Sequence, residues 1–513
     1  MASYLMGIDI GTTGAHAMLF DLEGNALGSG YREYASVFPA EHQVEQEAEL
    51  LVESVFEVCR QTVSQAKVDP KEVLAVSLTS QRATFGLMDA DGKILGGRFY
   101  VWQDNRALSV LPEIAARIRA EELYQLTGMP LTPTFSLEKL VWIKKHQPER
   151  YARTRTIVFP ADYLLFRFGA GVLRTEVTCA CCSGMIDIRT LDWSGRALDA
   201  VGLDRAKLAP LVRPGTVVGK LSREAAGRSG LAEGTLLVTG TGDQQAAALG
   251  AGVIESGRAS LTLGTAGLLV VGTRQLELEK SPGLMAPSSG LLGLYELEGI
   301  QLGAASCFRW TRDLFFHPDL TGENTTPPAV NRYKQMDRLI LGSPPGANGL
   351  VFLPFLSGAG YPHWDPLASG TFTGLRFSHT HADLMRAVLE GISLESFDMY
   401  QQMRKAGVTI ASLAVTGGAM ESPVWRQTIA DVFNMEISPL RVPNATLVGA
   451  ALFAGIGAGV FRDVAEGVAR TVRFEPPVQP IPGNVETYRK RYETYRCLCA
   501  ALTPKPFAGD ARV

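Results

Sequence analysis

A short run of aspartate, glycine and threonine, Asp9-Ile-Gly-Thr-Thr-Gly14, lies near the start of the chain between two apolar segments that are typical of β-strands. Glycines let backbone N–H groups approach a phosphate closely, and the hydroxyls of Thr12 and Thr13 would add donors. The carboxylate of Asp9, at the end of the first strand, could hold Mg²⁺. A plain hairpin turn with one capping aspartate explains the same run equally well.

A second glycine-threonine turn, Gly264-Thr-Ala-Gly267, lies within the apolar stretch 259–271, about half the chain length further on. Neither turn is a Walker loop, because Gly-x4-Gly-Lys-Ser/Thr is absent, and neither is a Rossmann fingerprint, because a strand rather than a helix follows. Two such units, one in each half, predict duplicated α/β domains around a central cleft. Facing turns would then hold the polyphosphate of a nucleotide from both sides.

A third candidate is the aspartate in Thr239-Gly-Thr-Gly-Asp243-Gln-Gln, which follows a predicted strand. Phosphoryl transfer to a hydroxyl needs a carboxylate that orients the hydroxyl and accepts its proton, and Asp243 suits that role. Aspartate after glycine is also a common helix cap, and an alanine-rich helix is predicted over 246–251. Both roles stay open. The glycine turn within 414–420 would admit a flat adenosine group, but it equally suits a tight strand-to-helix connection.

Strands and helices that alternate along the chain must position these residues. The patterns predict strands at 73–78, 156–159, 350–353 and 411–416, and helices at 46–66, 110–126 and 383–405. The run Cys179-Ala-Cys-Cys182 could be half of a metal site, but no second Cys or His group stands at a ligand spacing. Reduced, buried thiols on an alternating strand explain this run better.

Length and composition indicate a globular protein with two large domains, at residues 1–252 and 253–513. The net charge is −3, with Lys and Arg scattered along the chain, which argues against a nucleic-acid partner and favours a small molecule.

No basic segment precedes an apolar one at the start of the chain. The longest apolar run, 447–461, holds four glycines and is too short to span a bilayer. It predicts a buried helix packed closely against a neighbour, and we expect a cytoplasmic protein.

The four candidate segments, in this order, resemble the FGGY carbohydrate kinases of the actin-like ATPase superfamily, over residues 4 to about 500. Trp102-Gln-Asp-Asn-Arg106 is similar to the substrate loop of that family, and Lys139-Leu-Val-Trp142 follows it in the expected order. Gly370-Thr-Phe-Thr-Gly374 and the segment 383–390 match its C-terminal pattern. Together these matches are specific, whereas each glycine-threonine turn alone is not.

The resemblance implies two ribonuclease-H-like domains that close on a sugar and on ATP with Mg²⁺. Asp243 matches the catalytic base, and Asp9 and Asp243 match the metal site. The residues implied to bind substrate are Gln81, Arg82, Trp102, Asp104, Asp243 and Gln244. The residues implied to bind ATP are Thr12, Thr13, Gly264, Thr265, Gly303, Gly417, Gly418 and Ala419.

The substrate implied by the resemblance is less specific than the fold. Arg82 resembles the glycerol kinases, but Ala83 and Thr134 replace a Glu and a Tyr of that group. Ala359-Gly360 stands in place of an acidic-basic pair, and Asn444 in place of a common Glu. Spacing and the tail at 488–501 are closest to xylulokinase-like members, which favours a ketopentose such as xylulose.

Three other interpretations remain at this point. One is a degenerate kinase that binds sugar without turnover, although the intact Asp9, Asp243 and both glycine-threonine turns argue against it. The acceptor could instead be glycerol, gluconate, another polyol or a signalling sugar of the autoinducer-2 type. The chain could also be an ATPase module like actin or the chaperones, without sugar transfer, although the Trp102 loop and Asp243-Gln244 argue against this. A homodimer would be compatible with the family.

Overall fold

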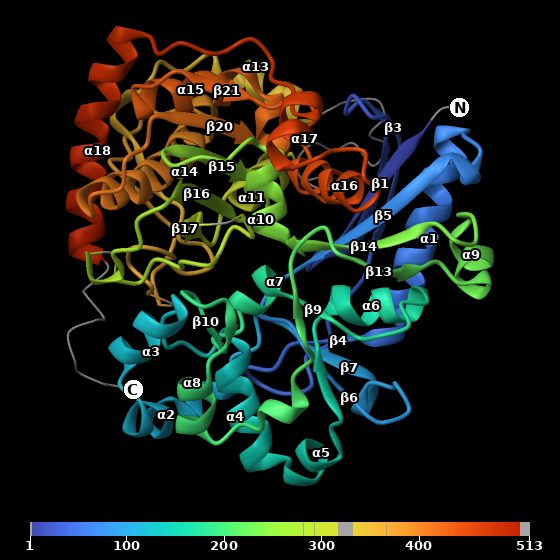
Figure 1. The fold of residues 1–513 in the computed structure, drawn as a ribbon. Coiled ribbons are helices and arrows are strands. Elements are labelled where there is room, and N and C mark those ends of the chain that lie inside the picture. Colours follow the sequence, from blue (N-terminus) through green and yellow to red (C-terminus); the bar gives the residue numbers. More distant parts are fainter. Residues whose placement is uncertain (1–2, 281, 292, 317–331, 366, 503–513) are drawn as a thin grey trace. The chain divides into compact units, whose positions relative to one another are not determined.

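The computed structural model describes residues 3–280, 282–291, 293–316, 332–365 and 367–502 (Figure 1). The chain forms two compact units, each assembled from several segments. Unit 1 comprises residues 1–256, 272–297 and 444–473, and unit 2 comprises 257–271, 298–443 and 474–513. The two domains predicted from the sequence, residues 1–252 and 253–513, are continuous halves of the chain, and the boundary between them stays a prediction.

Unit 1 is built on a six-stranded sheet in the order β13-β14-β5-β1-β2-β3. The hairpin β1 (Tyr4–Ile10) and β2 (Gly14–Phe20) continues antiparallel into β3 (Ala26–Glu33). The strands β5 (Val73–Ser80) and β14 (Leu236–Gly242) run parallel to β1, and β13 (Val217–Lys220) pairs antiparallel with β14. The carboxyl ends of β1, β5 and β14 therefore meet at one edge of the sheet.

The alternation of side chains along β1 decides what each face of this sheet carries. Met6, Ile8 and Ile10 are fully buried in a core with residues of α1 (Ala48–Ala66). Gly7, which points to the other face, leaves room for α16 (Ala445–Gly457), since a Cβ atom there would lie 2.4 Å from the carbonyl oxygen of Leu447. Asp9 follows the same alternation and lies on the α16 face.

The helix α10 (Asp243–Gly250) packs on α16 with almost no space between the backbones. A Cβ atom on Gly449 would lie 2.0 Å from the carbonyl oxygen of Ala246, and one on Gly250 would lie 2.0 Å from that of Ala445. The prediction of a closely packed buried helix in 447–461 is therefore confirmed. This packing fixes the first turn of α10, which carries Asp243.

A five-stranded sheet, most of whose residues belong to unit 2, repeats this arrangement in the order β17-β16-β15-β20-β21. The hairpin β15 (Arg258–Leu263) and β16 (Gly267–Thr273) is antiparallel, as β1 and β2 are, and β17 is Tyr295–Gln301. The strands β20 (Ser412–Thr416) and β21 (Ile437–Pro439) run parallel to β15. The predicted duplication of an α/β domain, each copy opening with a strand–turn–strand unit, is confirmed.

A separate subdomain of unit 1 lies between β5 and β13 and has its own apolar core. It carries β7 (Arg98–Tyr100), α4 (Ser136–His146) and α7 (Val177–Cys181). The other elements of unit 1 are β4 (Glu45–Glu47), β6 (Gly86–Met88), α2 (Leu111–Arg117), α3 (Ala120–Thr127), α5 (Pro148–Arg153), β8 (Thr156–Val158), α6 (Pro160–Phe168), β9 (Thr175–Glu176), β10 (Ile186–Asp187), β11 (Asp192–Trp193), α8 (Gly195–Val201), β12 (Leu211–Val212), α9 (Arg223–Ser229) and α17 (Val464–Thr471). The other elements of unit 2 are α11 (Ala305–Phe315), α13 (Arg332–Ile340), β18 (Val351–Leu353), β19 (Thr371–Thr373), α14 (His381–Lys405), α15 (Pro423–Phe433) and α18 (Pro482–Leu502).

Two local predictions were wrong. The single helix expected at 110–126 is two helices, α2 and α3, because Ile118 adopts an extended conformation and buries its side chain in the subdomain core. The cysteine run forms the short helix α7 instead of a strand. The side chain of Glu176 accepts hydrogen bonds from the N–H groups of Thr178 and Cys179 and so caps that helix. The thiols of Cys179, Cys181 and Cys182 are buried, as predicted.

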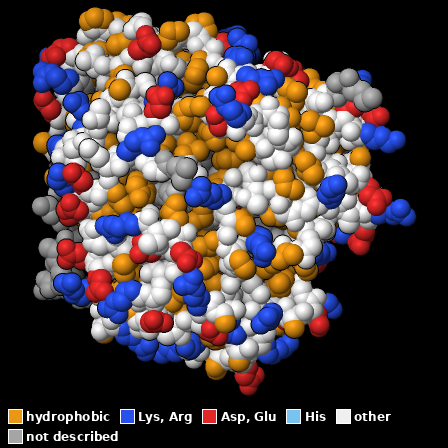
Figure 2. Space-filling model, in the orientation of Figure 1, with side chains coloured by type: hydrophobic (Ala, Val, Ile, Leu, Met, Phe, Trp, Pro, Cys, Tyr) orange, Lys and Arg blue, Asp and Glu red, His pale blue; other side chains and the backbone are white. Residues whose placement is uncertain are grey.

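The charged side chains on the surface and the apolar character of the helices bear on the predictions from the sequence. On the face shown in Figure 2, Lys and Arg side chains are scattered among Asp and Glu. No helix in the described part of the chain combines the length and apolar character needed to cross a membrane.

Candidate active site

The carboxyl end of β1 carries a buried acid, Asp9. Its Oδ1 is inaccessible to solvent and has no hydrogen-bond partner within the part of the chain that the structure describes. Burial, with a further contribution from the charge of Asp243, raises the pKa of Asp9 well above its usual value. Two carboxylates that disfavour each other's charge form a place where a cation would be stabilised.

The turn after β1 is held rigidly through its backbone carbonyls. The Gly11 N–H donates to the Gly14 carbonyl at 3.0 Å, and the hydroxyl of Tyr34 donates to the Gly11 carbonyl at 2.5 Å. Nε2 of Gln46 donates to the Thr12 carbonyl at 2.6 Å. The side chain of Thr13 is exposed at the tip of this turn. The predicted turn is therefore formed, and its carbonyls are bonded to the protein.

Asp243 is the first residue of α10, at the carboxyl end of β14. Gly242 is the N-cap, and Oδ1 of Asp243 accepts the Gln244 N–H at 2.8 Å. The same oxygen lies 3.2 Å from Nε of Arg82. The carboxylate thus binds the first turn of the helix and pairs with a cation, and with 22% of its side chain exposed it is still reachable by a ligand.

Arg82 follows β5 and is held from three directions. Besides Asp243, its Nη1 lies 3.2 Å from Sγ of Cys182 and 3.4 Å from Oε1 of Gln245. A Cβ atom on Gly242 would lie 2.6 Å from Cδ of Arg82, so glycine at that position makes room for the arginine. The guanidinium therefore has a defined position beside the carboxylate of Asp243.

Three acceptor oxygens at this edge of the sheet have no donor among the residues that the structure describes. In addition to Oδ1 of Asp9, the amide oxygens Oε1 of Gln81 and Oε1 of Gln244 are buried without a hydrogen-bond partner. Buried acceptors are normally paired, and leaving one unpaired costs about 1–3 kcal/mol. A ligand rich in hydroxyl groups, or a cation, would satisfy them.

The Trp102 loop is connected to the first turn. Nε1 of Trp102 donates to Oγ1 of Thr12 at 2.8 Å. Asp104, predicted to bind substrate, is fully buried, and both of its oxygens accept hydrogen bonds from Arg106 while Oδ2 also accepts the Val44 N–H. In this structure Asp104 holds its own loop, and its contact with substrate stays a prediction.

The remaining predicted residues lie together in unit 2. The Gly264 carbonyl accepts the Ala305 N–H at 2.8 Å, which sets the second glycine-threonine turn against the start of α11. Gly417 lies against the end of β15, since a Cβ atom there would be 2.4 Å from the Leu263 carbonyl oxygen. Thr265, Gly303, Gly418 and Ala419 belong to these same connections. The structure thus groups the six unit-2 residues, as it groups Asp9, Gln81, Arg82, Asp243 and Gln244 in unit 1.

The whole-chain comparisons decide the family. Residues 4–250 match the N-terminal domain of the FGGY family of carbohydrate kinases, and residues 259–458 match its C-terminal domain. The chain belongs to this family. It is a carbohydrate kinase, and its fold is the one expected of the actin-like ATPases.

Several kinases of this family are similar to the chain over nearly its full length. Xylulose kinase of Bacillus subtilis is 26% identical over 494 residues, which cover 96% of each chain. Glycerol kinase of Nitratidesulfovibrio vulgaris is 30% identical over 491 residues, covering 93% of this chain and 95% of the relative. The crystal structure of gluconate kinase from Lactobacillus acidophilus superposes with a TM-score of 0.87 at 26% identity, covering 98% of this chain and 99% of that one.

Some residues at this FGGY kinase site were not singled out from the sequence. Gln46 contacts both Thr12 and Gln81, since its Oε1 accepts from Nε2 of Gln81 at 2.7 Å. Gln46 is fully buried, but a glutamine where a helix was expected to begin carries no local signal of that role. Cys182 belongs to the cysteine run and Lys139 to the family pattern, but neither pattern indicates which groups these side chains contact.

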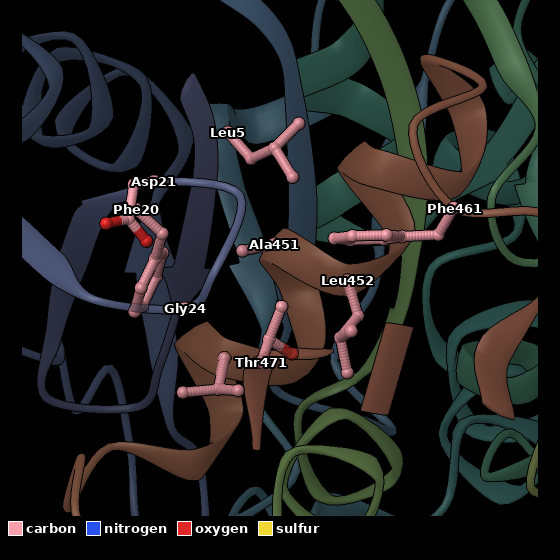
Figure 3. A pocket seen from close by; sticks show the side chains of 9 residues that line it. Leu5, Phe20, Asp21, Gly24, Ala451, Leu452, Phe461 and Thr471 are labelled. Carbon is pink, nitrogen blue, oxygen red and sulfur yellow. The ribbon is translucent and has the colours of Figure 1, made fainter. Parts of the chain in front are cut away.

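A pocket elsewhere in unit 1 is not part of this site. Figure 3 shows Leu5, Ala451, Leu452 and Phe461 around it, and the other lining residues include Phe20 and Thr471. Leu5 pairs with Phe20 at the end of the β1–β2 hairpin opposite the Gly11–Gly14 turn. The pocket is therefore separated from Asp9 by the length of β1.

Proposed function

We propose that this carbohydrate kinase transfers the terminal phosphoryl group of ATP to a hydroxyl of a small sugar, with a ketopentose such as xylulose as the favoured acceptor. The observation that carries the proposal is the group of unpaired acceptors at one sheet edge, on Asp9, Gln81 and Gln244, beside the paired Arg82 and Asp243. A polyhydroxylated acceptor supplies the donors that these oxygens lack.

In this proposal Asp243 is the catalytic base. Its carboxylate accepts a hydrogen bond from the acceptor hydroxyl and takes the proton as the oxygen attacks phosphorus. Arg82 and the Gln244 N–H hold Oδ1 of Asp243, and Nε2 of Gln244 lies 3.4 Å from Oδ2, so the carboxylate has a defined position beside the acceptor hydroxyl. Gln81 and Gln244 orient the acceptor through their amide oxygens, and the indole of Trp102 gives it an apolar wall.

The residues present fit a magnesium ion. Mg²⁺ is usually bound by one or two carboxylates together with waters and phosphate oxygens. Asp9 offers a buried oxygen without a hydrogen-bond partner among the described residues, and burial together with the charge of Asp243 raises its pKa, so a bound cation would stabilise its carboxylate. We propose Asp9 and Asp243 as the carboxylates that hold it. When bound, Mg²⁺ neutralises charge on the phosphates of ATP.

ATP is the donor that the family implies. Unit 1 contributes Thr12 and Thr13 to its binding in this proposal. Unit 2 contributes the second turn and the adenosine loop, namely Gly264, Thr265, Gly303, Gly417, Gly418 and Ala419. Rigid turns suit this role, because phosphoryl transfer depends mainly on positioning and on stabilising the charge of the phosphates.

The identity of the acceptor rests on the relatives and on the pocket residues. The relatives named above act on xylulose, glycerol and gluconate, and a signalling sugar of the autoinducer-2 type is a further candidate of the same class. Ala83 and Thr134 argue against glycerol, because they remove a carboxylate and an aromatic ring that glycerol kinases have there. Membership of the family argues against the alternative of an actin-like or chaperone-like ATPase without sugar transfer.

A panel of acceptors tests the proposal. ADP formation would be measured by a coupled assay with pentuloses, hexuloses, glycerol and other polyols, and aldonates, each with ATP and Mg²⁺. We expect a ketopentose to give the highest kcat/KM. A tenfold preference for gluconate or glycerol would overturn the acceptor while keeping the kinase, and no stimulation by any acceptor would overturn sugar transfer itself.

A further inference from the structure

A buried lysine lies behind the acceptor side of the site. Lys139, on α4, is inaccessible to solvent. Its Nζ donates to the carbonyl of Thr134 at 2.6 Å, to that of Val101 at 2.7 Å and to that of Trp102 at 3.3 Å. The three N–H bonds of the ammonium group therefore each have a backbone carbonyl as acceptor.

These carbonyls belong to two segments that contribute to the site. Val101 and Trp102 begin the loop after β7, and Thr134 precedes α4 at a position where the glycerol kinases carry a substrate-contacting residue. The indole of Trp102 in turn donates to the hydroxyl of Thr12, on the first glycine-threonine turn. Lys139 is thus connected through one residue to the turn that we propose binds phosphate.

Burial of the charged ammonium group of Lys139 does not favour folding by itself. Burying an ammonium group without a directly paired carboxylate is unfavourable, and an apolar side chain of similar length would fill the same space. Burial lowers the pKa of Lys139 to about 7, and the charge of Arg106 acts in the same direction. Asp104 and Glu138 oppose this shift, although burial raises the pKa of Glu138 to about 8 and so weakens its charge near neutral pH.

The proton on Lys139 matters for the geometry. A neutral amine has two N–H donors and one lone pair, so it cannot donate to three carbonyls, and its lone pair would face a carbonyl oxygen. Loss of the proton therefore loosens one of the two segments.

We propose that Lys139 is a positioning residue for phosphoryl transfer, whose ammonium group fixes the Trp102 loop and thereby keeps the indole of Trp102 on the hydroxyl of Thr12. This inference rests on the proposed function, since it gives the acceptor loop and the phosphate turn a common support. Lys139 itself touches neither substrate.

The test compares two lysines of the same helix. Lys139→Met removes the N–H donors but keeps a side chain of nearly the same length. Lys145→Met is the control, because Lys145 is half-exposed and pairs with Glu113. We expect kcat/KM for the acceptor to fall about 10–100-fold in Lys139→Met, as for other small misplacements of reacting groups, and to stay within twofold in Lys145→Met. In the wild type we expect kcat/KM to decline as the pH rises through about 7, and Lys139→Arg should lack this decline.

A second measurement does not depend on turnover, so it separates this inference from the proposed function. Hydrogen–deuterium exchange should increase in segments 11–14 and 101–106 of Lys139→Met, and in neither segment of Lys145→Met. The wild type should show the same increase between pH 6 and 8.5 after correction for intrinsic exchange, which covers the case that Lys139→Met does not fold. Unchanged exchange in both segments, or a uniform loss of activity with the wild-type pH profile, would overturn the inference.

Discussion

Nε of Arg82 lies 3.2 Å from Oδ1 of Asp243, although the two residues are far apart in the sequence. The pairing follows from the sheet, because β5 and β14 are parallel neighbours and Ser80 pairs with Gly242. The residues just beyond these two positions therefore meet at one edge. The guanidinium of Arg82 fixes one carboxylate oxygen of the proposed base, and Nε2 of Gln244 lies 3.4 Å from the other.

Removing Arg82 should impair acceptor use more than nucleotide binding. In Arg82→Ala, Asp243 loses its partner and the acceptor loses a donor, so we expect kcat/KM for the acceptor to fall by about 10²-fold. The Kd for ATP, measured by calorimetry, should change less than threefold. Arg223→Ala is the control, because Arg223 is exposed and pairs with Glu233 on the surface. An equal loss for both ligands would argue against a role on the acceptor side.

Gly242 offers a finer perturbation of the same pair. In Gly242→Ala the new methyl group would lie 2.6 Å from Cδ of Arg82 and 2.5 Å from Oε1 of Gln245, so the arginine must move. We expect a loss of at least about tenfold in kcat/KM. The matched change Gly227→Ala, where no heavy atom lies within 4 Å of the new methyl group, should leave activity unchanged. Normal activity in Gly242→Ala would show that the position of Arg82 is unimportant.

Asp9→Asn should stabilise the metal-free protein while abolishing activity. The pKa of Asp9 is raised in the folded state, so between its ordinary value and the raised one the folded state binds more protons than the unfolded state. Stability attributable to this group is therefore lost as the pH rises through that window. Asn carries no charge, and we expect its thermal midpoint at pH 8 to exceed that of the wild type by about 1–3 °C, with the difference vanishing below about pH 4.

Added Mg²⁺ supplies the control for Asp9. In the presence of nucleotide, Mg²⁺ should raise the midpoint of the wild type and have a smaller effect on Asp9→Asn. Scanning fluorimetry with and without the ion measures both effects. A variant that is less stable than the wild type at pH 8, or that responds equally to Mg²⁺, would contradict the proposed metal site.

The sequence allowed the two glycine-threonine turns and the strand before Asp243 to be predicted, because each depends on residues close together in the chain, and the recurrence of the same strand–turn–strand unit in each half predicted the duplication. Contacts that depend on the register between strands could not be predicted from the sequence. The pairing of Arg82 with Asp243 and the contacts of Gln46 with Thr12 and Gln81 arise only when distant segments meet.

The errors also have local physical causes. The helical pattern at 110–126 did not reveal that Ile118 would leave the helix to enter a core. The spacing of the cysteines suggested a strand, but Glu176 caps a helix there. Asp104 is a different case, because its ion pair with Arg106 leaves its predicted contact with substrate untested.

The most direct test of the account is single-turnover transfer of labelled phosphate from ATP to the best acceptor in Asp243→Asn. Asn keeps the shape of the side chain but cannot accept the proton of the hydroxyl, so transfer should fall by at least about 10³-fold while ATP still binds with a Kd within about threefold of the wild type. Transfer at the wild-type rate in this variant would contradict the role of Asp243 and the mechanism built on it.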